Sequence, residues 1–210
     1  MLNKYIDIIN YISTFSCIIP LVIYWNNKKT IFREFNLISI YLIICLIVET
    51  ILAYTFINSI KVKNIGVSFV VIELLILSIY FWDLFDNVFK RILSFLIYVT
   101  LLLFIIKILD LYTISINLFF GGTKVILILI GLNILLSSFL VVIPRWKLIL
   151  NYSILQYSTL GVVISAFADF FISHREYLGI YNLINSLNNL VFYVLLTISI
   201  IQCKKQFSQA

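Results

Sequence analysis

The stretch FVVIELLILSIYF, residues 69–81, consists almost entirely of valine, leucine, isoleucine and aromatic residues, yet it carries one acid, Glu73, near its middle. A second stretch, LIICLIVETILAY at residues 42–54, has the same character and carries Glu49. Such runs are too apolar for the surface of a soluble protein. An ionisable group inside a bilayer costs about 3 kcal/mol or more, so it usually faces the protein interior and serves a purpose. The position of these two acids is therefore the main clue to function.

The composition of the whole chain agrees with a membrane location. Of its 210 residues, 63% are hydrophobic and 11% are charged, whereas about a quarter of the residues of a soluble domain are charged. A membrane-spanning helix needs roughly 20 apolar residues, and backbone polar groups in lipid must pair within the segment. The sequence predicts an all-α membrane protein, a single seven-helix bundle over residues 1–210. The seven segments lie near 6–25, 36–57, 65–87, 92–112, 123–143, 149–172 and 179–202.

The distribution of cations predicts the orientation of this bundle. With the N-terminus outside, nine lysines and arginines fall on the cytoplasmic side and six, including Lys124, fall outside. Positive charge favours cytoplasmic loops, so we expect the C-terminus inside. The net charge of +6 then reflects this bias and contact with anionic membrane lipid. We therefore expect no nucleic-acid partner.

The two glutamates are expected at the same depth. Helices 36–57 and 65–87 form a hairpin with its tip near Lys61, and each glutamate lies twelve residues from that tip. At a rise of 1.5 Å per residue, both lie in the outer half of the membrane, near its midplane. Burial among apolar groups disfavours the ionised form, and a neighbouring cation reverses this. We expect at least one glutamate to be protonated at neutral pH unless such a cation lies beside it.

Other polar residues of the outer half are candidates for the same site. Asn182, Asn185 and Asn189 share one side of the last helix, because they are spaced by three and four residues. Asp169 lies on a face of small residues in the sixth helix, and Tyr80 continues the face of Glu73. An outward-leaning polar cavity lined by these residues would bind a ligand. The alternative is that the acids and amides only join helices through hydrogen bonds.

Several chemistries have no support in the sequence. A retinal protein needs a lysine deep in its last helix, and the last helix here has none before Lys204. His174 is the only histidine, which excludes a histidine-rich zinc site and leaves open a site with one histidine and several carboxylates. The three cysteines, Cys17, Cys45 and Cys203, lack metal-ligand spacing and are expected to pack in apolar helices. The sequence GGT at 121–123 is expected to form the loop before the fifth helix. We predict no catalytic residue, no metal and no cofactor.

The glutamate-bearing hairpin also carries a resemblance. The segments LISIYLIICLIVETILAYTF and VSFVVIELLILSIYF resemble the corresponding hairpin of small seven-helix proteins of the bacterial inner membrane. That group is uncharacterised, so the resemblance implies a fold and a location in the bacterial inner membrane and no activity.

The favoured function is a sensor or receptor-like module that binds a small or lipid-like ligand from outside. Its loops are too short for an enzymatic output, so a signal would pass to a cytoplasmic or membrane protein partner through helix shifts. One alternative is a transporter for a small solute or a proton-coupled substrate. Another is a lipid-modifying enzyme that uses paired carboxylates as acid and base.

Overall fold

The chain folds into helices that run alongside one another. A computed structural model describes residues 2–57, 64–109, 116–174 and 177–208. The helices are α1 (Leu2–Phe15), α2 (Ile18–Ile57), α3 (Ile65–Phe81), the short 3₁₀ helix η1 (Trp82–Leu84), α4 (Asn87–Ile108), α5 (Ile116–Ser137), α6 (Arg145–Ser173) and α7 (Leu178–Ser208). Helix is thus the regular structure throughout these residues, as the sequence predicts.

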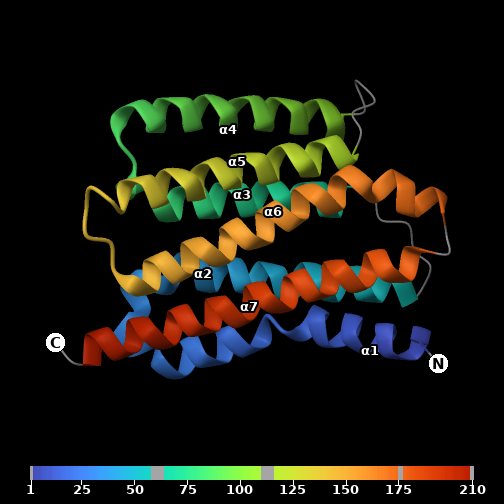
Figure 1. The fold of residues 1–210 in the computed structure, drawn as a ribbon, viewed down its shortest axis with the longest axis horizontal. Helices are drawn as coiled ribbons and strands as arrows, with labels where there is room; N and C mark the ends of the chain where they lie inside the picture. Colours follow the sequence, from blue (N-terminus) through green and yellow to red (C-terminus); the bar gives the residue numbers. More distant parts are fainter. Residues whose placement is uncertain (1, 58–63, 110–115, 175–176, 209–210) are drawn as a thin grey trace.

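Six helical stretches of the described residues are long and apolar enough to cross a membrane. The first of them, Ile8–Leu52, has 45 residues, about twice what a crossing requires. The two chain termini lie at opposite ends of the bundle (Figure 1). We call the end with the N-terminus the N side and the end with the C-terminus the C side.

The long first stretch contains a break and a reversal. The helix is interrupted at Ser16 and Cys17, and it resumes with Pro20 in the first turn of α2, where proline is tolerated because that turn has unpaired N–H groups. Farther along α2, the ring centroid of Phe35 lies 5.1 Å from that of Trp146, which belongs to the first turn of α6. Beyond this point α2 runs back toward the N side (Figure 1).

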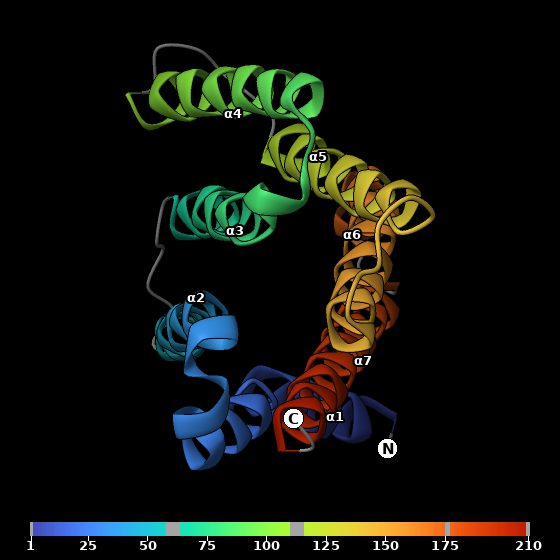
Figure 2. The ribbon, with the colours of Figure 1, turned by 90° about the vertical axis from the view of Figure 1, so that its left-hand side faces the viewer.

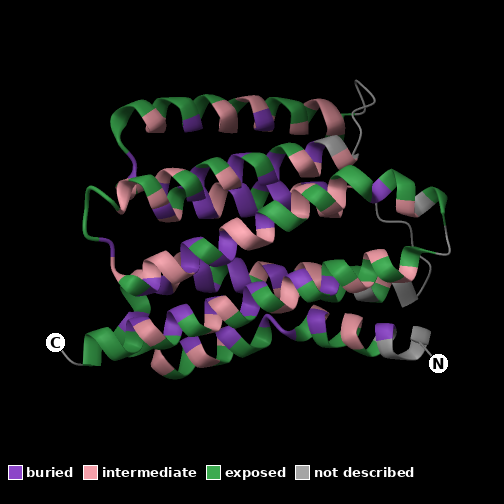
Figure 3. Cartoon of the chain, in the orientation of Figure 1, coloured by how far each residue is buried: buried purple, intermediate pink, exposed green. Residues whose placement is uncertain are grey.

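The core is shared by α2, α3, α5, α6 and α7. Its fully buried side chains are large and apolar, and include Phe35, Tyr41, Leu74, Ile130 and Leu196. Buried positions face the middle of the bundle, while exposed apolar residues cover its outside (Figure 3). Such an apolar exterior is suited to lipid.

Helix α4 lies at the margin of the bundle, beside α3 and α5 (Figure 2). Its described buried residues are only Leu93 and Thr100. Asp86 caps its first turn by accepting a hydrogen bond of 2.6 Å from the amide of Phe89. This helix therefore contributes little to the interior.

The predicted helix limits agree in part with the observed ones. The sixth and seventh predicted segments match α6 and α7 closely. The third was predicted to continue to residue 87, but α3 ends at Phe81 and Asn87 begins α4. The prediction of a loop at 121–123 was wrong, because both glycines lie inside α5, which begins at Ile116. Helix-breaking residues are tolerated inside membrane-spanning helices. The predicted hairpin tip at Lys61 and the predicted end of the fourth segment at 112 lie outside the described residues.

Candidate functional site

A buried ion pair joins α3 to α5 in the middle of the bundle. The ammonium nitrogen of Lys124 lies 2.5 Å from Oε2 of Glu73, and the two side chains are 6% and 0% exposed. Each residue lies about 12 Å along its helix from the N-side end, at 1.5 Å per residue. The lysine thus places a cation directly beside the buried carboxyl group of Glu73.

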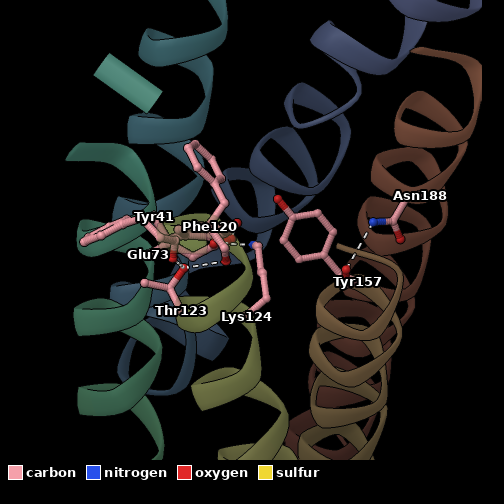
Figure 4. Close-up of polar contacts among 8 residues, drawn as sticks. Tyr41, Glu73, Phe120, Thr123, Lys124, Tyr157 and Asn188 are labelled. Atoms are coloured by element: carbon pink, nitrogen blue, oxygen red, sulfur yellow. Dashed lines mark hydrogen bonds and ion pairs between the residues drawn. The ribbon is translucent and has the colours of Figure 1, made fainter. Parts of the chain in front are cut away.

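Two tyrosines complete the surroundings of this pair (Figure 4). The Tyr41 hydroxyl of α2 donates a hydrogen bond of 2.9 Å to Oε1 of Glu73. The ammonium of Lys124 lies 3.8 Å from the ring centroid of Tyr157 on α6, within the range of a cation–π interaction. Four helices therefore meet at one pair of charges.

A glycine on α6 makes room for the lysine. A Cβ atom placed on Gly161 would lie 3.3–3.5 Å from three carbons of the Lys124 side chain. The lysine stem thus lies directly against the α6 backbone. Any larger residue at position 161 would have to share this space with it.

An amide network fixes α7 to α6 beside Tyr157. Asn188 donates a hydrogen bond of 3.1 Å to the carbonyl of Tyr157 and accepts one of 2.7 Å from Gln156. Tyr157 also packs against Phe192, with ring centroids 4.8 Å apart. The side of α7 that carries the asparagines is therefore held close to the ion pair.

A cavity of about 360 Å³ lies between the ion pair and the N side. This volume is at the small end of the range for ligand pockets, which runs from about 300 to 1,000 Å³. Its lining reaches from the first turns of α3, α5 and α7 to the middle of the bundle. The lining residues are Val48, Glu49, Leu52, Gly66, Phe69, Val70, Asn117, Phe120, Lys124, Tyr157, Gly161, Ile164, Ser165, Tyr181, Asn185, Asn188 and Asn189.

Glu49 lies on the wall of this cavity in a different setting from Glu73. It is partly buried, and none of the hydrogen bonds or ion pairs of the described residues involves it. Its carboxylate is therefore available to a molecule that enters the cavity.

The other residues predicted for the site divide into two groups. Asn185 and Asn189 line the cavity beside Glu49. Glu73 is not a lining residue, but it contacts Lys124, which is one. Asn182 is exposed and is not part of the lining. Asp169 is exposed too, but it accepts a hydrogen bond of 2.6 Å from Asn117, which is a lining residue.

Tyr80 lies away from the cavity, nearer the C side. Its hydroxyl oxygen is buried and has no hydrogen-bond partner among the residues that the structure describes. Three further side chains between the ion pair and the C side have a buried polar atom in the same condition: Ser78, Asn133 and Asn151. Buried polar atoms in proteins are normally paired with protein or water.

Three contacts of the ion pair were not predicted from the sequence: Lys124 and Tyr41 contact Glu73, and Tyr157 contacts Lys124. Lys124 was predicted to be an outer-side cation, because the preceding glycines suggested a loop. Tyr41 could have been found, since it precedes Cys45 and Glu49 by four and eight residues and so shares their helix face. Tyr157 gave no comparable signal, because its role depends on the packing of α6 against α5.

Among the described residues, no three histidine, cysteine, aspartate or glutamate side chains gather closely enough to hold a metal ion. Cys17, Cys45 and Cys203 are buried free thiols. The arrangement can accept hydrogen bonds, supply charge and enclose a small molecule.

Comparison of the chain with protein-family models, with curated proteins and with solved structures finds no match. The function must therefore be argued from the site itself.

Proposed function

We propose that this protein is a receptor-like module of a membrane, which binds a small ligand in the N-side cavity. The observation that carries the proposal is the cavity, with an ion pair at its inner end and an unpaired carboxylate on its wall. Ligand pockets typically combine apolar walls with a few polar groups that fix orientation. The described lining has this composition.

We further propose seven membrane crossings, with the N-terminus outside and the C-terminus in the cytoplasm. The reversal of α2 would give the first long stretch two crossings, and the opposite positions of the termini favour an odd number (Figure 1). Lys124 is inside the bundle, so the sequence retains five outer cations against nine inner ones. This difference favours the proposed orientation. The resemblance noted above adds the bacterial inner membrane as the location.

A route for a signal runs along α7. This helix lines the cavity with Asn185 and Asn189 on the N side. Toward the C side, Ser199 donates a hydrogen bond of 2.7 Å to the carbonyl of Trp146, in the first turn of α6. A ligand that shifts α7 would therefore move the cytoplasmic end of α6. A cytoplasmic or membrane protein partner would read that movement.

Mass spectrometry of small molecules that co-purify with the protein in mild detergent tests ligand binding. Ser165 lines the cavity, so Ser165→Leu should displace a bound molecule by filling part of the space. Thr159 is exposed on the same helix and is not a lining residue, so Thr159→Leu is the matched control. Equal retention by the wild type and both variants would remove the cavity from the proposal.

A transporter is the second candidate, and one observation favours it. Ser78, Tyr80, Asn133 and Asn151 carry unpaired buried polar atoms between the ion pair and the C side. Water that satisfied these atoms would extend a polar route beyond the cavity. Alternating access would then expose the cavity to both sides of the membrane in turn.

Single-cysteine labelling distinguishes the two functions. In a chain whose three native cysteines are replaced by alanine, Asn185→Cys reports on the cavity. Val142→Cys reports on the C side, because Val142 is 97% exposed in the loop between α5 and α6. For a receptor, an impermeant thiol reagent should reach position 185 from the N side alone. Labelling of position 185 from both sides would favour the transporter.

The same variants test the orientation. On intact cells, an impermeant reagent should label Asn185→Cys and leave Val142→Cys unmodified until the membrane is opened. The reverse pattern would contradict the proposed placement of the N-terminus outside.

A further inference from the structure

We propose that the cavity selects a small organic cation, and that Glu49 supplies the charge that binds it. This inference rests on the proposed ligand-binding function and adds the chemical class of the ligand. Three features of the described lining support it: the balance of charges, the aromatic walls and the free amides.

One acidic side chain of the cavity has no cation of the described residues beside it. Among the described lining residues, Glu49 carries the carboxyl group and Lys124 the amino group, and Lys124 is already paired with Glu73 at 2.5 Å. Glu49 has no ion-pair partner among the described residues. An uncompensated carboxylate at this depth is unfavourable, so a cation bound beside Glu49 would be stabilised.

The charged groups of the lining also disfavour an anionic ligand. A phosphate or carboxylate would require a free cation, and the one lysine of the described lining is occupied by Glu73 and by the ring of Tyr157. An anion would also approach the charge of Glu49. The cavity therefore discriminates by charge sign.

Aromatic rings line the cavity on several sides. Phe69, Phe120 and Tyr181 come from α3, α5 and α7, and Tyr157 comes from α6. The faces of such rings attract cations within about 6 Å. Tyr157 already acts in this way toward Lys124, at 3.8 Å. Rings combined with a carboxylate are the pattern expected for an organic ammonium group.

Two asparagine side chains remain available for hydrogen bonds to the ligand. Asn188 uses its oxygen and its amide group within the protein. Asn185 and Asn189 line the cavity, and none of the hydrogen bonds of the described residues involves their side chains. They would bind a hydroxyl or amide of the ligand. The volume of about 360 Å³ limits that ligand to a small molecule.

Pairs of cations and uncharged isosteres test the inference directly. The probes are choline with 3,3-dimethylbutan-1-ol, cyclohexylammonium with cyclohexanol, and guanidinium with urea. Binding to the full chain in lipid nanodiscs is measured by isothermal titration calorimetry. At least one cation should bind about tenfold more tightly than its isostere, or more, which corresponds to about 1.4 kcal/mol.

A matched pair of substitutions assigns this preference to Glu49. Glu49→Gln should abolish the preference for the cation while leaving the binding of the isostere unchanged. Glu34→Gln is the control, because Glu34 lies near the C side, 3.6 Å from Lys147, and does not line the cavity. This variant should retain the full preference.

Two results would overturn the inference: none of the three cations binds more tightly than its isostere, or the preference survives in Glu49→Gln. Either result leaves the proposed function open to its own test. If Ser165→Leu still loses a co-purified neutral or anionic molecule, the ligand-binding function stands and the cation class is wrong. If that molecule is retained by Ser165→Leu, the ligand-binding function fails as well.

Discussion

The two glutamates occupy equivalent positions in the sequence and different positions in the protein. Each lies twelve residues from Lys61, and each is surrounded by apolar residues. Glu73 is fully buried between Lys124 and Tyr41, whereas Glu49 lies on the cavity wall without a partner among the described residues.

The difference arises from α5, which brings a lysine to one acid and leaves the other free. One acid thus supports the structure of the site, and the other can serve its ligand. The depth of an acidic residue in a membrane therefore does not by itself define its role.

The largest effect is expected from removal of the cation beside Glu73. Lys124→Met leaves a buried carboxylate without compensation, and breaking a buried ion pair in this way costs about 3–5 kcal/mol. Unfolding in mixed micelles of detergent and sodium dodecyl sulfate measures the loss. The double variant Lys124→Met/Glu73→Gln is the control, because it removes both charges and should recover about half of the loss or more. A double variant as unstable as the single one would show that the lysine acts through packing.

A smaller loss is expected when the hydrogen bond from Tyr41 is removed. Tyr41→Phe deletes the donor to Glu73 at 2.9 Å, and a hydrogen bond to a charged group contributes about 1.5–3 kcal/mol. Tyr80→Phe is the matched control, because the Tyr80 hydroxyl has no partner, and its removal should be neutral or slightly stabilising. Equal losses in both variants, measured by the same unfolding assay, would contradict the assignment of Tyr41 to the acid.

Crowding of the lysine stem should come next in size. Gly161→Leu places a side chain where Lys124 lies, and overpacking of this kind costs about 1–3 kcal/mol. Gly122 offers a control on α5, because a Cβ atom there meets nothing within 4 Å. Gly122→Leu should gain about 1 kcal/mol from helix propensity. A stable Gly161→Leu variant that keeps the full cavity would show that the lysine can move aside.

The helices were predictable because hydropathy acts locally along the chain. The largely apolar sequences of α3 and of the second half of α7 led directly to helices. Lys124 was not recognised, because Gly121 and Gly122 resemble a loop in sequence, although INLFFGGTKVILILI is apolar on both sides of them. A predicted apolar segment that began at residue 116 would have placed Lys124 well inside a helix.

The grouping of the site residues could not be predicted in the same way. Asn185 and Asn189 were correctly expected on one face of the last helix, but which neighbour faces them depends on the packing of α6 against α7. The partner of Glu73 comes from α5, some fifty residues away in sequence. Such pairings are set by tertiary contacts, and no local periodicity records them.

The smallest loss of stability is expected at Glu49, in contrast to Glu73. Glu49→Gln keeps the shape of the side chain and breaks no ion pair of the described residues. The free energy of unfolding should therefore stay the same or rise, because the variant removes a carboxylate that no described cation compensates. Glu73→Gln, which leaves Lys124 buried without its partner, should lower it.

A cationic ligand should separate the two glutamates further. A molecule that binds only the folded state raises the free energy of unfolding as its concentration rises. The tightest-binding cation of the probe set should thus stabilise the wild type and leave Glu49→Gln unchanged, as measured by thermal unfolding in the same detergent. Because the substitution alone is expected to cost no stability, a loss of ligand stabilisation cannot be attributed to misfolding. Equal stabilisation of the wild type and Glu49→Gln would show that the charge of Glu49 is not what holds the cation.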